Sequence, residues 1–149
     1  MSTQTANLQV DVMAFLLPKD HHARLLRPGE TIPASLNAGF DMLGKIDPNW
    51  IWILESQSEI RGILVASDCH GCAFVWRLVV SPGMGNVAVI RLLRRFAMDI
   101  RERGLKGYLT LLSAENDTET RLKGIVEKLG GKSGGQFTLM ASWLPKENI

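Results

Sequence analysis

A glycine-containing turn between a strand-like and a helix-like segment is the place where this sequence could do chemistry. The turn reads Ser81-Pro82-Gly83-Met84-Gly85-Asn86; it follows the apolar run Phe74–Val80 and precedes a helical pattern that begins at Val87. Pro82 lacks a ladder N–H, and the two glycines tolerate positive φ angles. Such a turn presents the unpaired N–H groups and the positive dipole end of the next helix, which suits a phosphate-bearing ligand.

The only two cysteines, Cys69 and Cys72, have the spacing of a redox motif or of half a zinc site. A zinc site needs about four ligands, and the sequence holds no second Cys/His pair, since His21 and His22 are adjacent. A thioredoxin-like site needs a helix N-terminus, whereas strand-like segments flank this motif. We therefore expect two reduced thiols beside a hairpin turn, and we assign no metal.

Length and composition indicate one globular domain over residues 1–149. Hydrophobic residues make up 46% and charged residues 21%, and the formal charge of +2 does not favour a nucleic-acid partner. No apolar run approaches the ~20 residues that span a bilayer, so no membrane association is expected. The N-terminus is polar without the basic and apolar regions of a secretory signal, which favours a cytoplasmic location.

Hydrophobic periodicity predicts an α/β (mixed α+β) fold with the order β-α-α-β-β-β-α-β-α-β. The expected strands are Leu8–Leu17, Trp50–Glu55, Ile60–Ser67, Cys72–Val80, Gly107–Leu112 and Gln136–Leu144. The expected helices are Lys19–Leu26, Pro33–Leu43, Val87–Arg103 and a last helix capped by Asp117 or Thr118, with the apolar stripe Leu122, Ile125, Val126 and Leu129. Three antiparallel strands followed by a β-α-β crossover require a mixed, mostly antiparallel sheet with helices on its faces.

This order, together with the segment from Phe74 to Arg103, resembles the GCN5-related N-acetyltransferase (GNAT) superfamily over essentially the whole chain. The best-matching pieces are Val80-Ser81-Pro82 before the long helix and Asn116 after the next strand. A third piece is Val126-Glu127-Lys128-Leu129-Gly130, where the family usually reads Tyr-Glu-Lys-Leu-Gly-Phe.

The resemblance implies acetyl-CoA as co-substrate, bound where Cys72–Val80 and Gly107–Leu112 run parallel and then diverge. The pantetheine arm would lie along the backbone of Leu78, Val79 and Val80. The pyrophosphate would take backbone N–H groups of the turn and first helical residues, and the residues that this resemblance assigns to the cofactor are Leu78, Val79, Val80, Gly83, Gly85, Asn86, Val87, Ala88 and Asn116. The turn departs from the family, since it is about one residue shorter and lacks the customary Arg-Gly-x-Gly.

Catalytic residues are not assigned from the sequence. Members of the family commonly protonate the departing thiolate with a tyrosine in the last helix, but Val126 stands at that position, and the only tyrosine, Tyr108, lies at the start of a strand. Candidate bases are Glu55, His70 and Glu115, and each can also be interpreted as a surface residue at the end of an element.

Three further groups leave a functional and a structural interpretation open. His21 and His22 could line a substrate mouth or be solvated on a short helix. Trp76 could stack on a substrate or pack in the core. The arginines of the long helix could approach the 3′-phosphate of CoA or form a solvated face; they are Arg91, Arg94, Arg95, Arg101 and Arg103.

Two functions follow from these residues. The first is an acyl-CoA-dependent N-acyltransferase that acetylates an amine-bearing small molecule or peptide by direct attack. The alternative is a catalytically degenerate GNAT-fold binding or assembly protein, since the shortened turn and Gly135-Gln136-Phe137-Thr138-Leu139 are similar to small GNAT-like proteins of tailed phages. In that case the protein would act in the host cytoplasm or the virion. A homodimer is left open.

Overall fold

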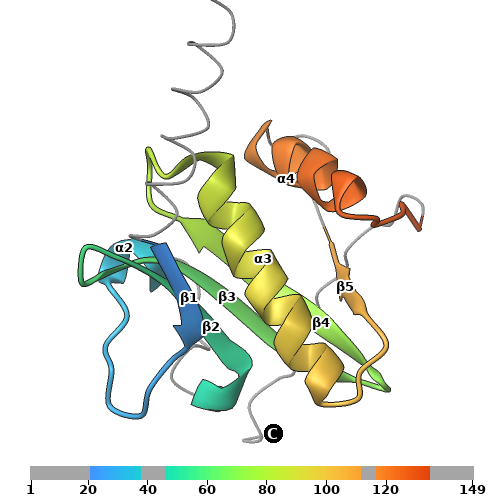
Figure 1. The fold of residues 1–149 in the computed structure, drawn as a ribbon, viewed down its shortest axis with the longest axis horizontal. Coiled ribbons are helices and arrows are strands. Elements are labelled where there is room, and N and C mark those ends of the chain that lie inside the picture. Colours follow the sequence, from blue (N-terminus) through green and yellow to red (C-terminus); the bar gives the residue numbers. More distant parts are fainter. Residues whose placement is uncertain (1–20, 38–45, 112–116, 135–149) are drawn as a thin grey trace, which may run out of the picture. The chain divides into compact units, whose positions relative to one another are not determined.

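The computed structural model describes residues 21–37, 46–111 and 117–134 (Figure 1). Its elements, in chain order, are β1 His21–Leu25, α2 Ala34–Asn37, the 3-10 helix η3 Pro48–Trp50, β2 Ile51–Ser56, β3 Glu59–Cys69, β4 Cys72–Val80, α3 Gly85–Glu102, β5 Tyr108–Thr110 and α4 Asp117–Lys128. The chain divides into two compact units, residues 1–112 and 113–149. The first unit contains the sheet with α2, η3 and α3, and the second contains α4.

The five strands of the first unit form one sheet in the order β1-β2-β3-β4-β5. Strands β1 to β4 pair antiparallel with their sequence neighbours, and β5 joins β4 in parallel after the crossover through α3 (Figure 1). The predicted mixed, mostly antiparallel sheet is confirmed. The order also places β4 between a fully paired neighbour, β3, and a short one, β5.

The core lies on both faces of this sheet because strand side chains alternate. On one face Leu36 of α2 packs with alternate strand residues, which are Ile51, Ile53, Ile63 and Val65. On the other face Trp52 meets Phe96 of α3, with ring centroids 4.8 Å apart at 80°. Helix α3 buries Leu92, Leu93, Phe96 and Ile100 on this face.

Two tight hairpins set the register of β2, β3 and β4. Gln57 and Ser58 have φ angles of 51° and 64°, and His70 and Gly71 have 52° and 91°. Two successive positive φ angles are typical of a type I′ turn, whose twist matches that of the strands. Because two residues suffice for each turn, β3 extends from Glu59 to Cys69, beyond both ends of the predicted Ile60–Ser67.

The prediction of a helix over Lys19–Leu26 is wrong for the described residues, since His21–Leu25 is strand β1. The segment pairs residue by residue with β2, from His21 opposite Ser56 to Leu25 opposite Trp52. A helix of this length is marginal by itself. The ladder to β2 satisfies the backbone of the segment and outweighs the weak helical spacing that local propensity suggested.

Other differences concern boundaries. Helix α3 begins at Gly85, two residues before the predicted Val87, and Trp50 ends η3 where a strand start was predicted. Strand β5 covers Tyr108–Thr110 of the predicted Gly107–Leu112, and α2 covers four residues of the predicted Pro33–Leu43. The predicted strands Leu8–Leu17 and Gln136–Leu144 lie outside the described residues, as does Asn116.

In the second unit, α4 begins at Asp117, one of the two predicted caps. It ends at a glycine pair: Gly130 has a φ of 99°, and the Gly131 N–H donates to the Val126 carbonyl at 2.8 Å. A left-handed glycine with a hydrogen bond back across the last turn is a common helix stop. In the part of the chain that the structure describes, no helix is long and apolar enough to cross a membrane.

Candidate functional site

Strands β4 and β5 pair over three residues only. The pairs are Ala73 with Tyr108, Phe74 with Leu109, and Val75 with Thr110. Beyond Val75, β4 continues to Val80 while still paired with β3 on its other edge. The expectation that these strands are parallel neighbours is confirmed, whereas their divergence stays a prediction, because residues 112–116 lie outside the described residues. Within the described residues, the edge of β4 that carries Leu78, Val79 and Val80 has no strand partner on the β5 side.

A β-bulge marks the point where the pairing with β5 stops. In the β3–β4 ladder Val65 opposes Arg77 and Ala66 opposes Val75, so Trp76 is the extra residue. The Trp76 ring is 58% exposed, its N–H donates to Ser67 Oγ at 2.7 Å, and its centroid lies 4.6 Å from that of Phe74. A bulge bends the strand and re-aims its side chains. Trp76 is therefore a surface residue in a fixed orientation, which rules out packing in the core.

The turn after β4 keeps its backbone accessible. Gly83 and Gly85 have φ angles of 86° and 73°, and an added Cβ at either glycine would meet no atom within 4 Å. The Ser81 N–H donates to the Arg61 carbonyl at 2.7 Å, which ties the start of the turn to β3. Glycine is required here by backbone conformation rather than by lack of room, so there is space in front of the turn for a ligand.

The N-terminus of α3 has no side-chain cap. Met84 occupies the N-cap position without a side-chain hydrogen bond, and the first turn contains no acidic residue. The amides at Gly85, Asn86 and Val87 therefore keep the donor character and the positive dipole end that favour an anion. Ala88 is fully buried, so its methyl group belongs to the core and only its backbone can face a ligand.

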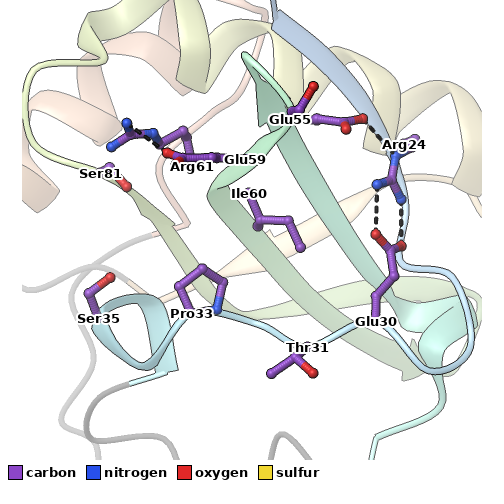
Figure 2. A pocket seen from close by; sticks show the side chains of 11 residues that line it. Arg24, Glu30, Thr31, Pro33, Ser35, Glu55, Glu59, Ile60, Arg61 and Ser81 are labelled. Carbon is purple, nitrogen blue, oxygen red and sulfur yellow. Dashed lines mark hydrogen bonds and ion pairs between the residues drawn. The ribbon is translucent and has the colours of Figure 1, made fainter.

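An open pocket of about 490 Å³ adjoins this turn through Ser81 (Figure 2). Its lining comes from the β1–α2 segment, from the β2–β3 hairpin and from the end of β4, and it comprises Arg24, Glu30, Thr31, Pro33, Ser35, Glu55, Ser58, Glu59, Ile60, Arg61 and Ser81. Ile60 lies between the charged groups in Figure 2. Three carboxylates against two guanidiniums give the lining a net formal charge of −1, which favours a cationic ligand over an anionic one.

An ion-pair network fixes one side of this pocket. The Arg24 guanidinium binds Glu30 through two hydrogen bonds of 2.6 and 2.8 Å, and its Nε donates to Glu55 Oε2 at 3.2 Å (Figure 2). The hydrogen bonds from Arg24 lower the pKa of Glu30 to about 2. The same bonds raise the pKa of Arg24. Both Glu30 and Arg24 therefore stay charged at neutral pH, and Glu55 is held by one carboxylate oxygen.

The residues predicted as bases are not brought together. Glu55 lines the pocket, whereas His70 is exposed in the β3–β4 turn, and Glu115 lies outside the described residues. His21 and His22 belong to β1 and line a different cavity, between β1 and α3. Cys69 and Cys72 are both free, and no group of three metal-ligating side chains occurs in the described ranges.

Neither residue considered as a general acid is suited to that role. Tyr108 packs against Phe96 of α3, with centroids 5.4 Å apart, and burial raises its pKa. A phenol that is harder to ionise and faces the core is a poor proton shuttle. Val126 lies in α4 of the second unit and has no titratable group.

Sequence reasoning missed Arg24 and Glu30, which hold the pocket together. Because a helix was predicted for residues 19–26, strand β1 was not expected. This strand brings Arg24 beside Glu55, which is 31 positions away in the sequence. The turn at Arg27-Pro28-Gly29 returns the chain so that Glu30 meets Arg24. Acidic and basic residues six positions apart form no helical pair, so the sequence carries no periodic signal for this contact.

Comparison with known proteins relates the chain through its three-dimensional structure. No protein-family model and no curated protein sequence matches it. The ribosomal-protein-S18-alanine N-acetyltransferase from Escherichia coli matches with a TM-score of 0.60 at 14% identity, covering 74% of this chain and 76% of that one. An aminoglycoside acetyltransferase from an uncultured soil metagenomic sample, in complex with sisomicin, matches with a TM-score of 0.57 at 12% identity, covering 85% and 99%.

A third match is AAC(6')-Iy in complex with a bisubstrate analog that contains CoA. Its TM-score is 0.55 at 16% identity, with 83% of this chain and 99% of that chain covered. At these identities the likeness concerns the fold. Together with the mixed sheet and the parallel pairing of β4 with β5, it shows that this chain has the GNAT fold, in a divergent form.

Proposed function

Starting from the GNAT fold of this chain, we propose that the protein is an N-acyltransferase that uses acetyl-CoA and acetylates an amine. The observation that carries the proposal is the free edge of β4, which leads into an open glycine turn and an uncapped helix N-terminus. When bound, acetyl-CoA supplies an activated acetyl thioester whose transfer to an amine releases the CoA thiolate.

The residues proposed to hold the co-substrate contribute mostly backbone. The amides of Gly85, Asn86 and Val87 bind the pyrophosphate. Gly83 and Gly85 let it approach the backbone closely because neither glycine carries a Cβ. The free edge of β4 at Leu78–Val80 pairs with the amides of the pantetheine arm. These interactions need no consensus side chain, so they tolerate the missing Arg-Gly-x-Gly. Ala88 contributes at most its N–H. A cofactor-binding role for Asn116 is proposed from the resemblance only.

The charge of the pocket in Figure 2 supports an amine-bearing acceptor. Glu55 and Glu59 each contact a guanidinium through one carboxylate oxygen, so they offer more to an ammonium group than Glu30, which binds Arg24 through both oxygens. Trp76 marks the point where the pairing of β4 with β5 stops. Ser81 lies five residues beyond it, a distance of roughly 16 Å at about 3.3 Å per residue. The pocket is therefore proposed to hold the part of the acceptor remote from the reacting amine.

Catalysis proceeds without a tyrosine acid. A CoA thiol has a pKa near the ordinary cysteine value of about 8.5, so the thiolate can leave unprotonated. General acid help is typically worth about 10²–10⁴-fold, so turnover is slow. The rate rises with pH as the acceptor amine deprotonates. Because no tyrosine acts as the acid, its titration does not lower the rate at alkaline pH.

Calorimetric titration with acetyl-CoA tests the binding site through a matched pair of variants. Gly85 and Gly104 lie at opposite ends of α3 with similar φ angles, 73° and 85°, and open space around both. Gly85→Val and Gly104→Val therefore introduce similar backbone strain. We expect only Gly85→Val to weaken acetyl-CoA binding, by about tenfold or more. Equal affinity in both variants would reject the glycine turn as the pyrophosphate site.

CoA release with a panel of polyamines, amino acids and peptide amines between about pH 6 and 10 tests the chemistry. Release above the hydrolysis background supports the acyltransferase. Binding of acetyl-CoA without any release identifies a degenerate, binding-only GNAT-fold protein, which is the second function considered from the sequence. Absence of both binding and release rejects the acyl-CoA site altogether.

A further inference from the structure

A second cavity, of about 420 Å³, lies between α3 and the edge strand β1. Its basic lining residues are Arg91, Arg94 and Arg95 of α3 and His21 and His22 of β1, and its apolar lining residues are Ala23, Val87, Ile90 and Met98. Among the described residues, no Asp or Glu lines it. We name this cavity the α3–β1 groove, and we propose that it binds an organic phosphate independently of the acyl-CoA site.

The groove and the acyl-CoA site share the first turn of α3, where the Val87 amide is proposed for the pyrophosphate and Val87 also lines the groove, but the strand order sets the groove apart from the region where β4 and β5 meet. Strand β1 is at one end of the sheet, and the pairing of β4 with β5 is at the other. Three strand spacings of about 4.8 Å separate β1 from β4, which is roughly 14 Å. The described residues that line the cavity come from α3 and β1, so a ligand between β4 and β5 does not also fill it.

The three arginines of the groove have one carboxylate partner among the described residues, Asp99. Arg91 and Arg95 stand four residues apart on the helix, where like charges repel and destabilise it by a few tenths of a kcal/mol. Asp99 pairs with Arg95 at 3.0 Å, but within the described residues Arg94 makes no hydrogen bond or ion pair. The groove thus retains positive charge that the fold does not need for its own stability.

Two further groups retain hydrogen-bonding capacity. Arg91 Nη1 donates to the His21 carbonyl at 3.3 Å, and this hydrogen bond holds the guanidinium beside the groove. A guanidinium has five donors, so others remain available. His21 Nδ1 is buried without a hydrogen-bond partner in the described part of the chain. A buried polar atom without a partner is costly, and its presence in this lining points to a polar ligand.

The chemistry of the lining selects a phosphate ester over a simple carboxylate. Guanidinium forks match phosphate oxygens in bidentate geometry, and two or more arginines suit a dianion. The apolar wall of Val87, Ile90 and Met98 offers a surface for the organic part, since Val87 is 45% and Met98 61% exposed. The volume falls within the usual range for small-molecule sites.

Titrations with inorganic phosphate, AMP, ribose 5-phosphate and uncharged adenosine test the proposal on the full chain, with methyl NMR shifts of Met98 and Ile90 reporting position. We expect both organic phosphates to bind and shift these methyls, and adenosine to leave them unchanged. Inorganic phosphate should bind more weakly than the esters. Arg94→Gln should weaken AMP binding about 10- to 100-fold, the usual value of a charge-assisted contact. Arg101→Gln, which removes the same charge outside the groove, should not.

Three results would overturn the proposal. Equal shifts with adenosine and AMP would show that the phosphate is not recognised. Tighter binding of a duplex oligonucleotide, uncompeted by AMP, would make the groove a nucleic-acid surface. Loss of acetyl-CoA affinity in Arg94→Gln would assign the arginines to the CoA 3′-phosphate. Failure of acetyl-CoA to bind wild-type protein affects the proposed function alone, since AMP binding at Met98 is measured without it.

Discussion

The two ends of helix α3 are built in opposite ways. At the C-terminus Gly104 and Leu105 donate to the carbonyls of Arg101 and Ile100, both at 3.0 Å. The Arg103 guanidinium lies 4.8 Å from the Trp50 ring centroid and 5.0 Å from that of Trp52. At the N-terminus Met84 provides no cap. The difference shows that the fold satisfies its own backbone at the end remote from the proposed site and leaves donors available at the end beside it.

The largest expected effect lies at the satisfied end. Trp52 is fully buried, packs on Phe96 and donates from Nε1 to Asp99 Oδ2 at 2.8 Å. Trp52→Ala should lower the free energy of unfolding by about 3–5 kcal/mol through lost burial and a large cavity. Urea denaturation measures this change. The half-buried Trp50 is the control, and Trp50→Ala should cost less; equal costs would mean that Trp52 does not anchor α3.

The glycine stop at the same end should contribute the next largest effect. Gly104 has a φ of 85°, where an L-residue costs about 1–2 kcal/mol. Gly104→Ala should destabilise the protein by this amount in thermal unfolding, while acetyl-CoA affinity stays unchanged. A loss of acetyl-CoA affinity would show that the two ends of α3 are coupled and do not have separate roles.

Stability on the side of the proposed site should depend on pH. The pKa of Glu30 is lowered from an ordinary value of 4.5 to about 2 by Arg24. A lowered folded-state pKa contributes stability that is fully present above about pH 4.5 and is lost as the pH falls towards 2. Solvent screens this partly exposed pair, so the contribution is on the order of 1 kcal/mol.

Glu30→Gln isolates that contribution. The stability difference between wild type and Glu30→Gln should be largest above about pH 5 and vanish near pH 2, as measured by urea unfolding across this range. Glu59→Gln is the control, because Glu59 pairs with Arg61 on the exposed surface at 2.9 Å. A difference that does not change with pH would mean that the Arg24–Glu30 bonds do not stabilise the charged carboxylate.

The smallest effect on stability comes from capping the open end. Met84→Asp supplies an N-cap acceptor and a negative charge at the positive end of the helix dipole, so it should raise stability by about 0.5–1 kcal/mol. The same carboxylate competes for the amides and repels phosphate, so acetyl-CoA affinity should fall. Met84→Ser is the uncharged control, with a smaller loss. Increased stability with unchanged affinity would contradict a binding role for these amides.

The sequence by itself determined the elements whose signals are local. Cys72–Val80 was predicted at its observed bounds because an apolar β-branched run between turn residues has few alternatives. The β-α-β order around α3 required a parallel crossover, and two glycines marked the turn before the helix. The turn therefore entered the candidate site from its residues, and the edge of β4 entered it from the family resemblance.

The tertiary structure decided everything that depends on contacts between distant segments. Strand β1 exists because β2 offers it a ladder, and no local pattern encodes that partner. Arg24 meets Glu55 across 31 positions, and Arg91 reaches the His21 carbonyl across 70. Side-chain periodicity describes the environment of one element at a time. The pocket and the α3–β1 groove, each lined by more than one element, appear only once the chain has folded.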